Sequence, residues 1–296
     1  YVMYSKNDLY LTSNDFSSFA DIIYSDRQKY TEEFFNSDYE IVEYSKDEQF
    51  KHITYKKLSF EITSGDVIFC NTNQVDNLFY HIKKLDNLKN ITLITHQTDQ
   101  MIDKSFYQKK PESIINWYSV NVDYKSDYLH SIPIGLASDF SLKNLTKENF
   151  DDFSIENFKK DNSKIYLNFN INTNFKERNG IQEFFKNKEF ATLDLVEPNK
   201  IKYLKNIKRF GFVLCPWGNG IDTHRFWETL YAGSIPVTKW HQTYKSAENL
   251  PVLFVNNYED ITEDLLKNYM DTLTPQNYNF EVLSKDYWVK RIKNDS

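Results

Sequence analysis

The chain has 296 residues and a net charge of -6, from 36 Lys and Arg against 42 Asp and Glu. This length predicts about two domains and is ample for buried cores. The acidic balance, without a long basic block, argues against a nucleic-acid partner. No apolar run approaches the roughly 20 residues that span a bilayer, and the N-terminus has no signal-peptide pattern.

The two cysteines, Cys70 and Cys215, lie inside apolar runs, where buried structural thiols are typical. We therefore expect no disulfide framework, and a reducing cytoplasm is the predicted location. The chain begins with Tyr1 rather than Met, which fits a domain cut from a larger enzyme.

The first sixty residues show no clear pattern, and an alternation of apolar runs and helical spacing begins after them. We expect strands at Asp66–Thr72, Ile91–Asp99 and Leu129–Ser138, and helices at Gln74–Leu85 and Glu112–Val120. This β-α-β-α-β order is typical of a parallel sheet.

A second α/β half follows Lys147–Ser163, which is charged and short of aliphatic residues. We place the domain boundary there, giving domains at 1–155 and 156–280 and a last helix, 281–296, that crosses back to the first domain. Further strands are expected at Lys164–Asn170, Ala191–Val196, Gly211–Cys215, Ser234–Thr238 and Pro251–Asn256. Helices are expected at Lys176–Asn187, Asn199–Arg209, Thr223–Ala232, Glu259–Leu273 and Asn277–Lys293. The sequence predicts two Rossmann-like, doubly wound domains facing a cleft, with ligands beyond the carboxyl ends of the strands.

The most informative motif lies between the Gly211–Cys215 strand and the Thr223–Ala232 helix. It contains Gly218, Asn219 and Gly220, although the whole chain has only seven glycines. Bare backbone there would let amide groups approach a ligand closely. Asp222 is the predicted N-cap of the following helix, and Gly233 its stop.

Thr223 and the side chains that follow it predict an anion site. His224, Arg225 and Glu228 share one side of the helix near its N-terminus, which is partially positive. Arg225 offers a cationic fork for phosphate oxygens, while Glu228 suits the two hydroxyls of a ribose. Arg225 and Glu228 alone would equally suit a surface ion pair, so the prediction of a nucleoside diphosphate depends on the whole combination.

This stretch resembles the donor-binding motif of exostosin-type glycosyltransferases, and is most similar to the bacterial and viral exostosin-like enzymes. The matching residues are Pro216, Gly218, Asn219, Gly220, Asp222, Thr223, His224, Arg225, Glu228, Gly233, Ile235, Pro236 and Val237. Thr229 and Trp217 depart from the pattern, where many members have Ala and Arg. Weaker similarity extends over about residues 66–260. The resemblance implies a two-domain GT-B fold, a nucleotide-sugar donor on the C-terminal half, an acceptor on the N-terminal half and no essential metal.

The sequence also contains no Asp-x-Asp motif and no histidine spacing typical of a metal site. Without a metal, the leaving diphosphate needs the helix N-terminus, Arg225 and a second cation. Lys176 and Arg178 are the predicted candidates, and Asn170 in the same loop is a further predicted donor contact. Both cations could equally be solvated charges that open a helix.

An inverting transfer needs a general base near the acceptor hydroxyl. Asp99 is the preferred candidate and His96 the second, because both follow a strand of the N-terminal half. Either could instead be a helix cap or turn residue. Asn121 and Asp123 could line the acceptor side.

The leading hypothesis is a glycosyltransferase that moves a sugar, from UDP more readily than GDP, to a glycan in bacterial surface-polysaccharide synthesis. Peripheral membrane association fits if the acceptor is lipid-linked. The alternatives are a GT-B sugar-nucleotide epimerase or hydrolase, and a non-catalytic nucleotide- or glycan-binding domain of a larger polymerase.

Overall fold

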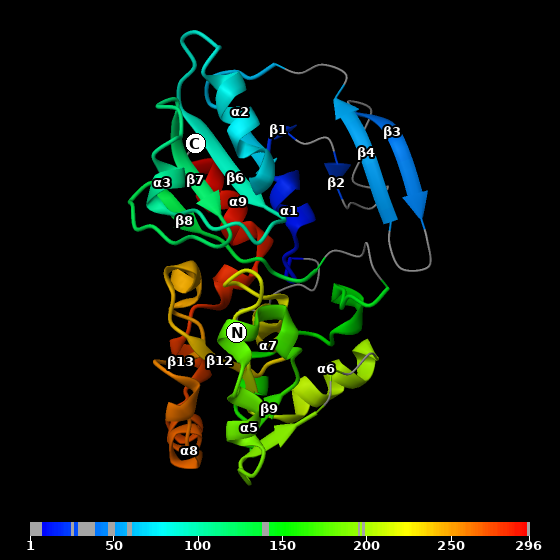
Figure 1. Cartoon of the computed structure of the whole chain (residues 1–296), viewed down its shortest axis with the longest axis vertical. Coiled ribbons are helices and arrows are strands. Elements are labelled where there is room, and N and C mark those ends of the chain that lie inside the picture. The colour runs from blue at the N-terminus through cyan, green and yellow to red at the C-terminus, as the bar shows by residue number, and fades with distance from the viewer. Residues whose placement is uncertain are drawn as a thin grey trace.

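The computed structural model describes residues 8–24, 61–137, 142–194, 196 and 199–294, and the backbone of three further strands within 27–57. Two five-stranded parallel sheets form two lobes, which lie one above the other in Figure 1. The predicted α/β class is confirmed, and the architecture is consistent with a Rossmann-like two-domain fold.

The N-terminal sheet has the strand order β1-β5-β6-β7-β8. These strands are Ile22–Tyr24, Val67–Asn71, Ile91–His96, Ile114–Ser119 and Leu129–Ser131. All six residues of β6 are buried, as expected of a parallel strand covered on both faces. The predicted helix α2 (Val75–Ile82) is confirmed and buries four apolar side chains at helical spacing. A separate antiparallel sheet contains β2 (Arg27–Gln28), β4 (Lys51–Lys57) and β3 (Tyr39–Lys46).

Strand β7 corrects the helix predicted at Glu112–Val120. Its residues are largely β-branched or aromatic and five of its six positions are buried. A surface helix needs a polar face, and this sequence does not supply one. A central strand of a parallel sheet is buried on both faces and needs no polar face. The helical turn between β6 and β7 is instead the short α3 (Lys104–Tyr107).

The C-terminal sheet has the order β10-β9-β11-β12-β13, so the winding direction reverses between β9 and β11. Its strands are Ala191–Leu193, Ile165–Leu167, Phe212–Leu214, Ile235–Lys239 and Leu253–Val255. All five fall within or one residue beyond the predicted ranges. Helices α6 (Lys200–Arg209) and α8 (Glu263–Thr272) also match predicted helices.

Three predicted elements are shorter or broken. Gly180 has a φ of 84°, which divides the expected Lys176–Asn187 helix into α4 (Phe175–Arg178) and α5 (Ile181–Phe185). The expected strand at Leu129–Ser138 ends as β8 at Ser131, because Pro133 lacks an N–H group and Gly135 has a φ of 67°. The last helix, α9 (Lys285–Asn294), begins later than predicted, after the 3-10 turns η8 (Pro275–Asn277) and η9 (Phe280–Leu283).

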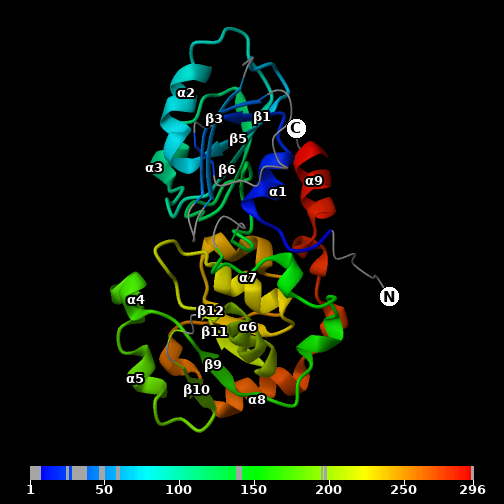
Figure 2. The ribbon, with the colours of Figure 1, turned by 90° about the vertical axis from the view of Figure 1, so that its right-hand side faces the viewer.

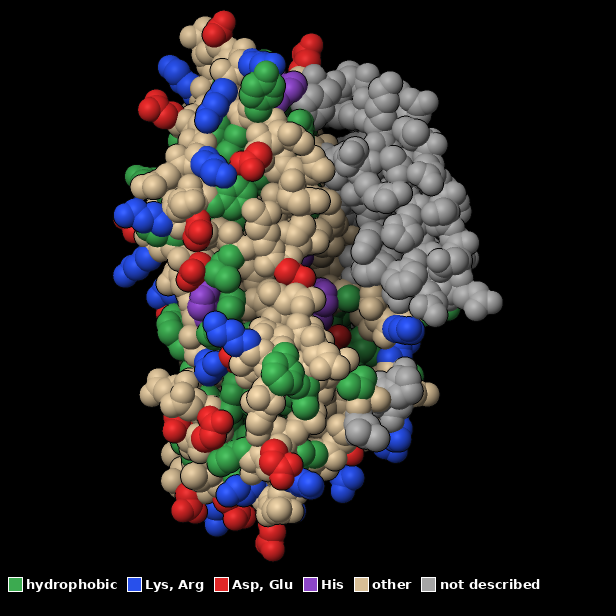
Figure 3. Space-filling model, viewed as in Figure 1, with side chains coloured by type: hydrophobic (Ala, Val, Ile, Leu, Met, Phe, Trp, Pro, Cys, Tyr) green, Lys and Arg blue, Asp and Glu red, His purple; other side chains and the backbone are tan. Residues whose placement is uncertain are grey.

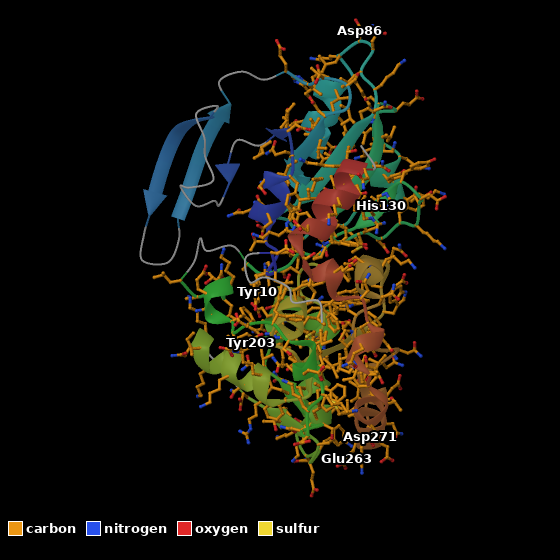
Figure 4. The ribbon with its side chains drawn as sticks, turned by 180° about the vertical axis from the view of Figure 1, so that it is seen from behind. Tyr10, Asp86, His130, Tyr203, Glu263 and Asp271 are labelled. Carbon is orange, nitrogen blue, oxygen red and sulfur yellow. The ribbon has the colours of Figure 1, made fainter. Side chains whose placement is uncertain are left out.

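The two lobes share one hydrophobic cluster, which includes side chains from both sheets. Tyr10 lies where the lobes meet (Figure 4), with its ring 4.8 Å from that of Tyr231. Helix α9 lies beside α1 (Ser13–Ser18) on the N-terminal lobe (Figure 2), where Trp288 packs 5.9 Å from Phe16. On the face in Figure 3 the surface is hollowed where the lobes meet. Within the described parts of the chain, no helix has the length and apolar character needed to cross a bilayer.

Candidate functional site

The predicted donor residues gather at the carboxyl edge of the C-terminal sheet. They lie on the loop after β9, the loop after β11, and helix α7 (His224–Tyr231). Because β9 and β11 flank the point where the strand order reverses, these loops border the position where doubly wound sheets bind ligands. The four side chains expected to face the core from α7, namely Phe226, Trp227, Leu230 and Tyr231, are all buried.

Arg178 forms hydrogen bonds with both the loop after β9 and the loop after β11. Its guanidinium is buried and donates to the carbonyl oxygens of Asn170 at 2.7 Å, Trp217 at 2.8 Å and Pro216 at 3.1 Å. Asn174 adds a bond of 2.7 Å from its amide nitrogen to Gly218 O. Arg178 therefore acts as a positioning residue, because these bonds hold the loop that follows β11.

A second arginine, Arg225, lies near Arg178. Burial, and then the charge of Arg225, lower the pKa of Arg178 to about 10, so both groups are cationic at neutral pH. For Arg225, burial alone would lower the pKa, but the neighbouring Tyr203, Cys215 and Glu228 outweigh this effect and raise it. Two like charges near one loop favour binding of an anion between or beside them.

Three buried polar atoms at this loop and the start of α7 lack a protein partner in the part of the chain that the structure describes, and one of them is Trp217 Nε1. Neither Arg225 Nε nor Thr223 Oγ1 has a hydrogen-bond partner among the described residues. Buried polar atoms are nearly always bonded to protein or to an ordered ligand. The Nε–H of Arg225 and the hydroxyl of Thr223 are therefore placed to donate hydrogen bonds to an anionic or hydroxylated ligand.

Glu228 lies one helical turn beyond Arg225 and is also buried. Tyr203 of α6 donates a hydrogen bond of 3.0 Å from its hydroxyl to Glu228 Oε2. Burial raises the pKa of Glu228, against lowering effects of His224, Arg225 and this bond. Tyr203 was not predicted as a site residue, and its place in a predicted amphipathic helix, next to the apolar Leu204, is a signal of packing rather than of binding.

The lobes touch directly at the glycine loop. A Cβ atom at Gly220 would lie 2.8 Å from Asn121 Nδ2 and 3.1 Å from Asp99 Oδ1, both from the N-terminal lobe. Asn121 is itself buried, and its Oδ1 accepts a bond of 2.9 Å from the backbone of Asp222. The absence of a side chain at Gly220 therefore has a packing reason that needs no ligand.

Asp222 joins the lobes rather than capping α7. The helix begins at His224, its N-cap is Thr223, and Thr223 makes no side-chain capping bond. The Asp222 carboxylate instead accepts bonds from Ile134 N at 2.8 Å, from Trp227 Nε1 at 2.9 Å, and from Thr223 N at 3.0 Å. Burial raises the pKa of Asp222 to about 7, although all three bonds favour its charged form.

The two candidates for the general base have different surroundings. His96 is buried, and its Nδ1 accepts from Gln97 N at 2.8 Å while its Nε2 contacts Pro133 O at 3.2 Å. Burial lowers the pKa of His96 to about 3, so the ring is neutral and both nitrogens face the protein. Asp99 is exposed next to Gly220. Of the two side chains, Asp99 is the one exposed to solvent.

The other predicted residues lie at the edges of this site. His224 Nδ1 donates to Gly135 O across the lobes at 2.8 Å. Asn170 Oδ1 caps its own 3-10 turn, and both Lys176 and Asn219 are exposed. Asp123 contacts His241 Nε2 at 3.1 Å. Among the described residues, no three His, Cys, Asp or Glu side chains are grouped to hold a metal ion.

No protein-family model matches the sequence. A search of curated proteins likewise finds no match. The resemblance to exostosin-type enzymes therefore depends on the motif residues, and it remains a prediction.

Proposed function

We propose that the chain is a glycosyltransferase of the GT-B type, which moves a sugar from a nucleoside diphosphate to a glycan acceptor. The observation that carries the proposal is the buried, unpartnered Nε of Arg225 at the switch point of the C-terminal sheet, near a second buried arginine. Such a position suits a phosphate group, which can bond to the guanidinium and offset both charges. A UDP-sugar is the favoured donor.

In this proposal the diphosphate lies against the N-terminus of α7, near Arg225 and Thr223. Glu228 has one carboxylate oxygen, Oε2, bonded to Tyr203, and we assign the other to a ribose hydroxyl. Arg178 stays with the protein carbonyls and keeps the loop in place.

Asp99 is the proposed general base, because it is exposed on the N-terminal lobe beside the glycine loop. Its carboxylate would take the proton from the acceptor hydroxyl as that oxygen bonds to the anomeric carbon. The bond from this carbon to the diphosphate breaks, and the nucleoside diphosphate leaves with the bonding electrons. The product would have inverted anomeric configuration.

The donor site is tested by calorimetric titration of the chain with UDP and with GDP, in EDTA. Arg225→Ala should weaken nucleotide binding by about 1–3 kcal/mol, the range of hydrogen bonds to charged groups. Lys267→Ala, at an exposed position of α8, is the matched control and should bind like the native chain. If neither nucleotide binds, or if Arg225→Ala binds equally well, the assignment of this site is wrong.

Transfer is tested separately with radiolabelled UDP-sugars and oligosaccharide acceptors. Asp99→Asn should keep nucleotide binding and lose transfer. Binding without transfer to any acceptor would favour the binding-domain alternative, and UDP release or epimerisation without an acceptor would favour a sugar-nucleotide hydrolase or epimerase.

A further inference from the structure

Helix α6 has two contrasting faces. Its inner face buries Leu204 and Ile207 and carries Tyr203 to Glu228 of the candidate site. Its outer face is exposed and consists of Ile201, Lys202, Lys205 and Arg209. The helix contains five cationic residues and no acidic one, namely Lys200, Lys202, Lys205, Lys208 and Arg209.

This concentration of positive charge is local, because the whole chain carries a net charge of -6. Lys208 and Lys200 bind neighbouring segments of the protein, and Arg209 lies over the ring of Phe210. Lys208 Nζ lies 2.6 Å from Asp151 Oδ2, and Lys200 Nζ donates to Asn144 O at 3.0 Å. Lys202, Lys205 and Arg209 are exposed, and Lys and Arg side chains are visible at the edge of the lower lobe (Figure 3), where Figure 1 places α6.

Exposed aliphatic side chains accompany these cations. Ile201 is 54% exposed, Val196 just before the helix is 56% exposed, and Leu142 is 73% exposed. Of these three side chains, Ile201 belongs to the exposed face of α6 itself. A cluster of Lys and Arg on one helix is typical of a surface that binds anionic lipid headgroups.

We propose that the outer face of α6, which includes Ile201, docks on an anionic phospholipid bilayer. Lys202, Lys205 and Arg209 would meet the lipid headgroups, while Ile201 enters the boundary between headgroups and acyl chains. This inference does not depend on the proposed function. It has a consequence for the candidate site, however, because Tyr203 on the opposite face of the same helix contacts Glu228. A helix is about 10 Å across, so docking would bring that site close to the membrane, within reach of a lipid-linked substrate.

The experiment is cosedimentation of the full chain with vesicles of phosphatidylcholine, either alone or mixed with phosphatidylglycerol, at low and at high salt. We expect binding to the mixed vesicles only, and weaker binding at high salt because charges at a surface are screened. A cation near an anionic surface contributes about fivefold to binding, so Lys202→Glu/Lys205→Glu should reduce binding by at least about twentyfold. Ile201→Ser should reduce it by a few fold at both salt concentrations, because the apolar contribution is not screened.

Lys267→Glu/Lys290→Glu is the matched control, since it reverses two exposed lysines on α8 and α9 and changes net charge equally. The control should bind more tightly than the α6 variant, and circular dichroism should show that both are folded. If the native chain does not bind the mixed vesicles, or both double variants lose binding equally, the proposal is wrong. Binding to immobilised heparin without binding to vesicles would also overturn it, in favour of an anionic polymer as the partner.

Discussion

Asp222→Asn tests whether a buried carboxylate at the lobe junction makes stability depend on pH. In the structure this carboxylate accepts bonds from Ile134 N, Trp227 Nε1 and Thr223 N, and burial raises its pKa to about 7 from an ordinary 3.8. The folded chain therefore keeps a proton that the unfolded chain releases between these two pH values. Folding is favoured by this group at low pH, and the stabilisation is lost as pH rises toward 7.

The size of the expected change in unfolding free energy follows from the interval between the two pKa values of Asp222. About two pH units of this interval lie above pH 5, and each unit of pKa difference corresponds to about 1.4 kcal/mol. From about pH 5 to about pH 8, the free energy of unfolding should therefore fall by about 3 kcal/mol through Asp222 alone. His96 acts in the opposite direction, because burial lowers its pKa to about 3 and its neutral form favours the fold as pH rises.

The contribution of Asp222 is isolated by comparing variants, because His96 is the same in each. Urea unfolding followed by tryptophan fluorescence would give the free energy of unfolding at several pH values. The native chain should lose about 3 kcal/mol relative to Asp222→Asn between about pH 5 and about pH 8. Asp161→Asn, which replaces an exposed carboxylate, should follow the native chain. Parallel curves for the native chain and Asp222→Asn would show that Asp222 does not hold a proton in the folded state.

Three further changes test the packing of the site. Gly220→Ala would place a Cβ atom 2.8 Å from Asn121 Nδ2 and should lower the free energy of unfolding by about 1–3 kcal/mol. Gly218→Ala is the control, because its nearest contacts are 3.4 Å away, and it should change this free energy little. Both values would be measured by urea titration. Tyr203→Phe leaves Glu228 Oε2 without its buried donor and should cost about 1–3 kcal/mol by the same measurement. Cys70 and Cys215 are buried and their thiol pKa values are raised, so both should react with Ellman's reagent only as the chain unfolds; rapid labelling in native buffer would contradict this.

Sequence patterns correctly predicted the helices whose buried side chains recur at regular spacing along one face. The four apolar side chains of α2 and of α7 follow helical spacing, and both helices are where the sequence placed them. Strand β7 was missed because an apolar run buried on nearly every position has no period that distinguishes strand from helix. Strand β1 was missed for another reason, since its three residues join the sheet only by pairing with β5, far along the chain.

The candidate site shows the same division between local and distant information. Sequence spacing placed His224, Arg225 and Glu228 near one helix end, because three and four residues make a helical turn. Sequence spacing could not show that the Asp222 carboxylate accepts a bond from Ile134 N, or that Arg178 donates its hydrogen bonds to three backbone carbonyls. Those contacts join segments that are separate in sequence, so no local pattern encodes them.

Contacts between the lobes account for some of the motif residues without a ligand, but not for all of them. Gly220 is explained by the close approach of Asn121, and the Asp222 carboxylate by its three donors. Neither residue then needs a ligand, and neither is evidence for one. Arg225 differs, because its Nε is buried without a partner among the described residues while its charge adds to that of Arg178. A buried donor is rarely left without an acceptor, so Arg225 is the residue whose substitution should separate a binding site from a lobe junction.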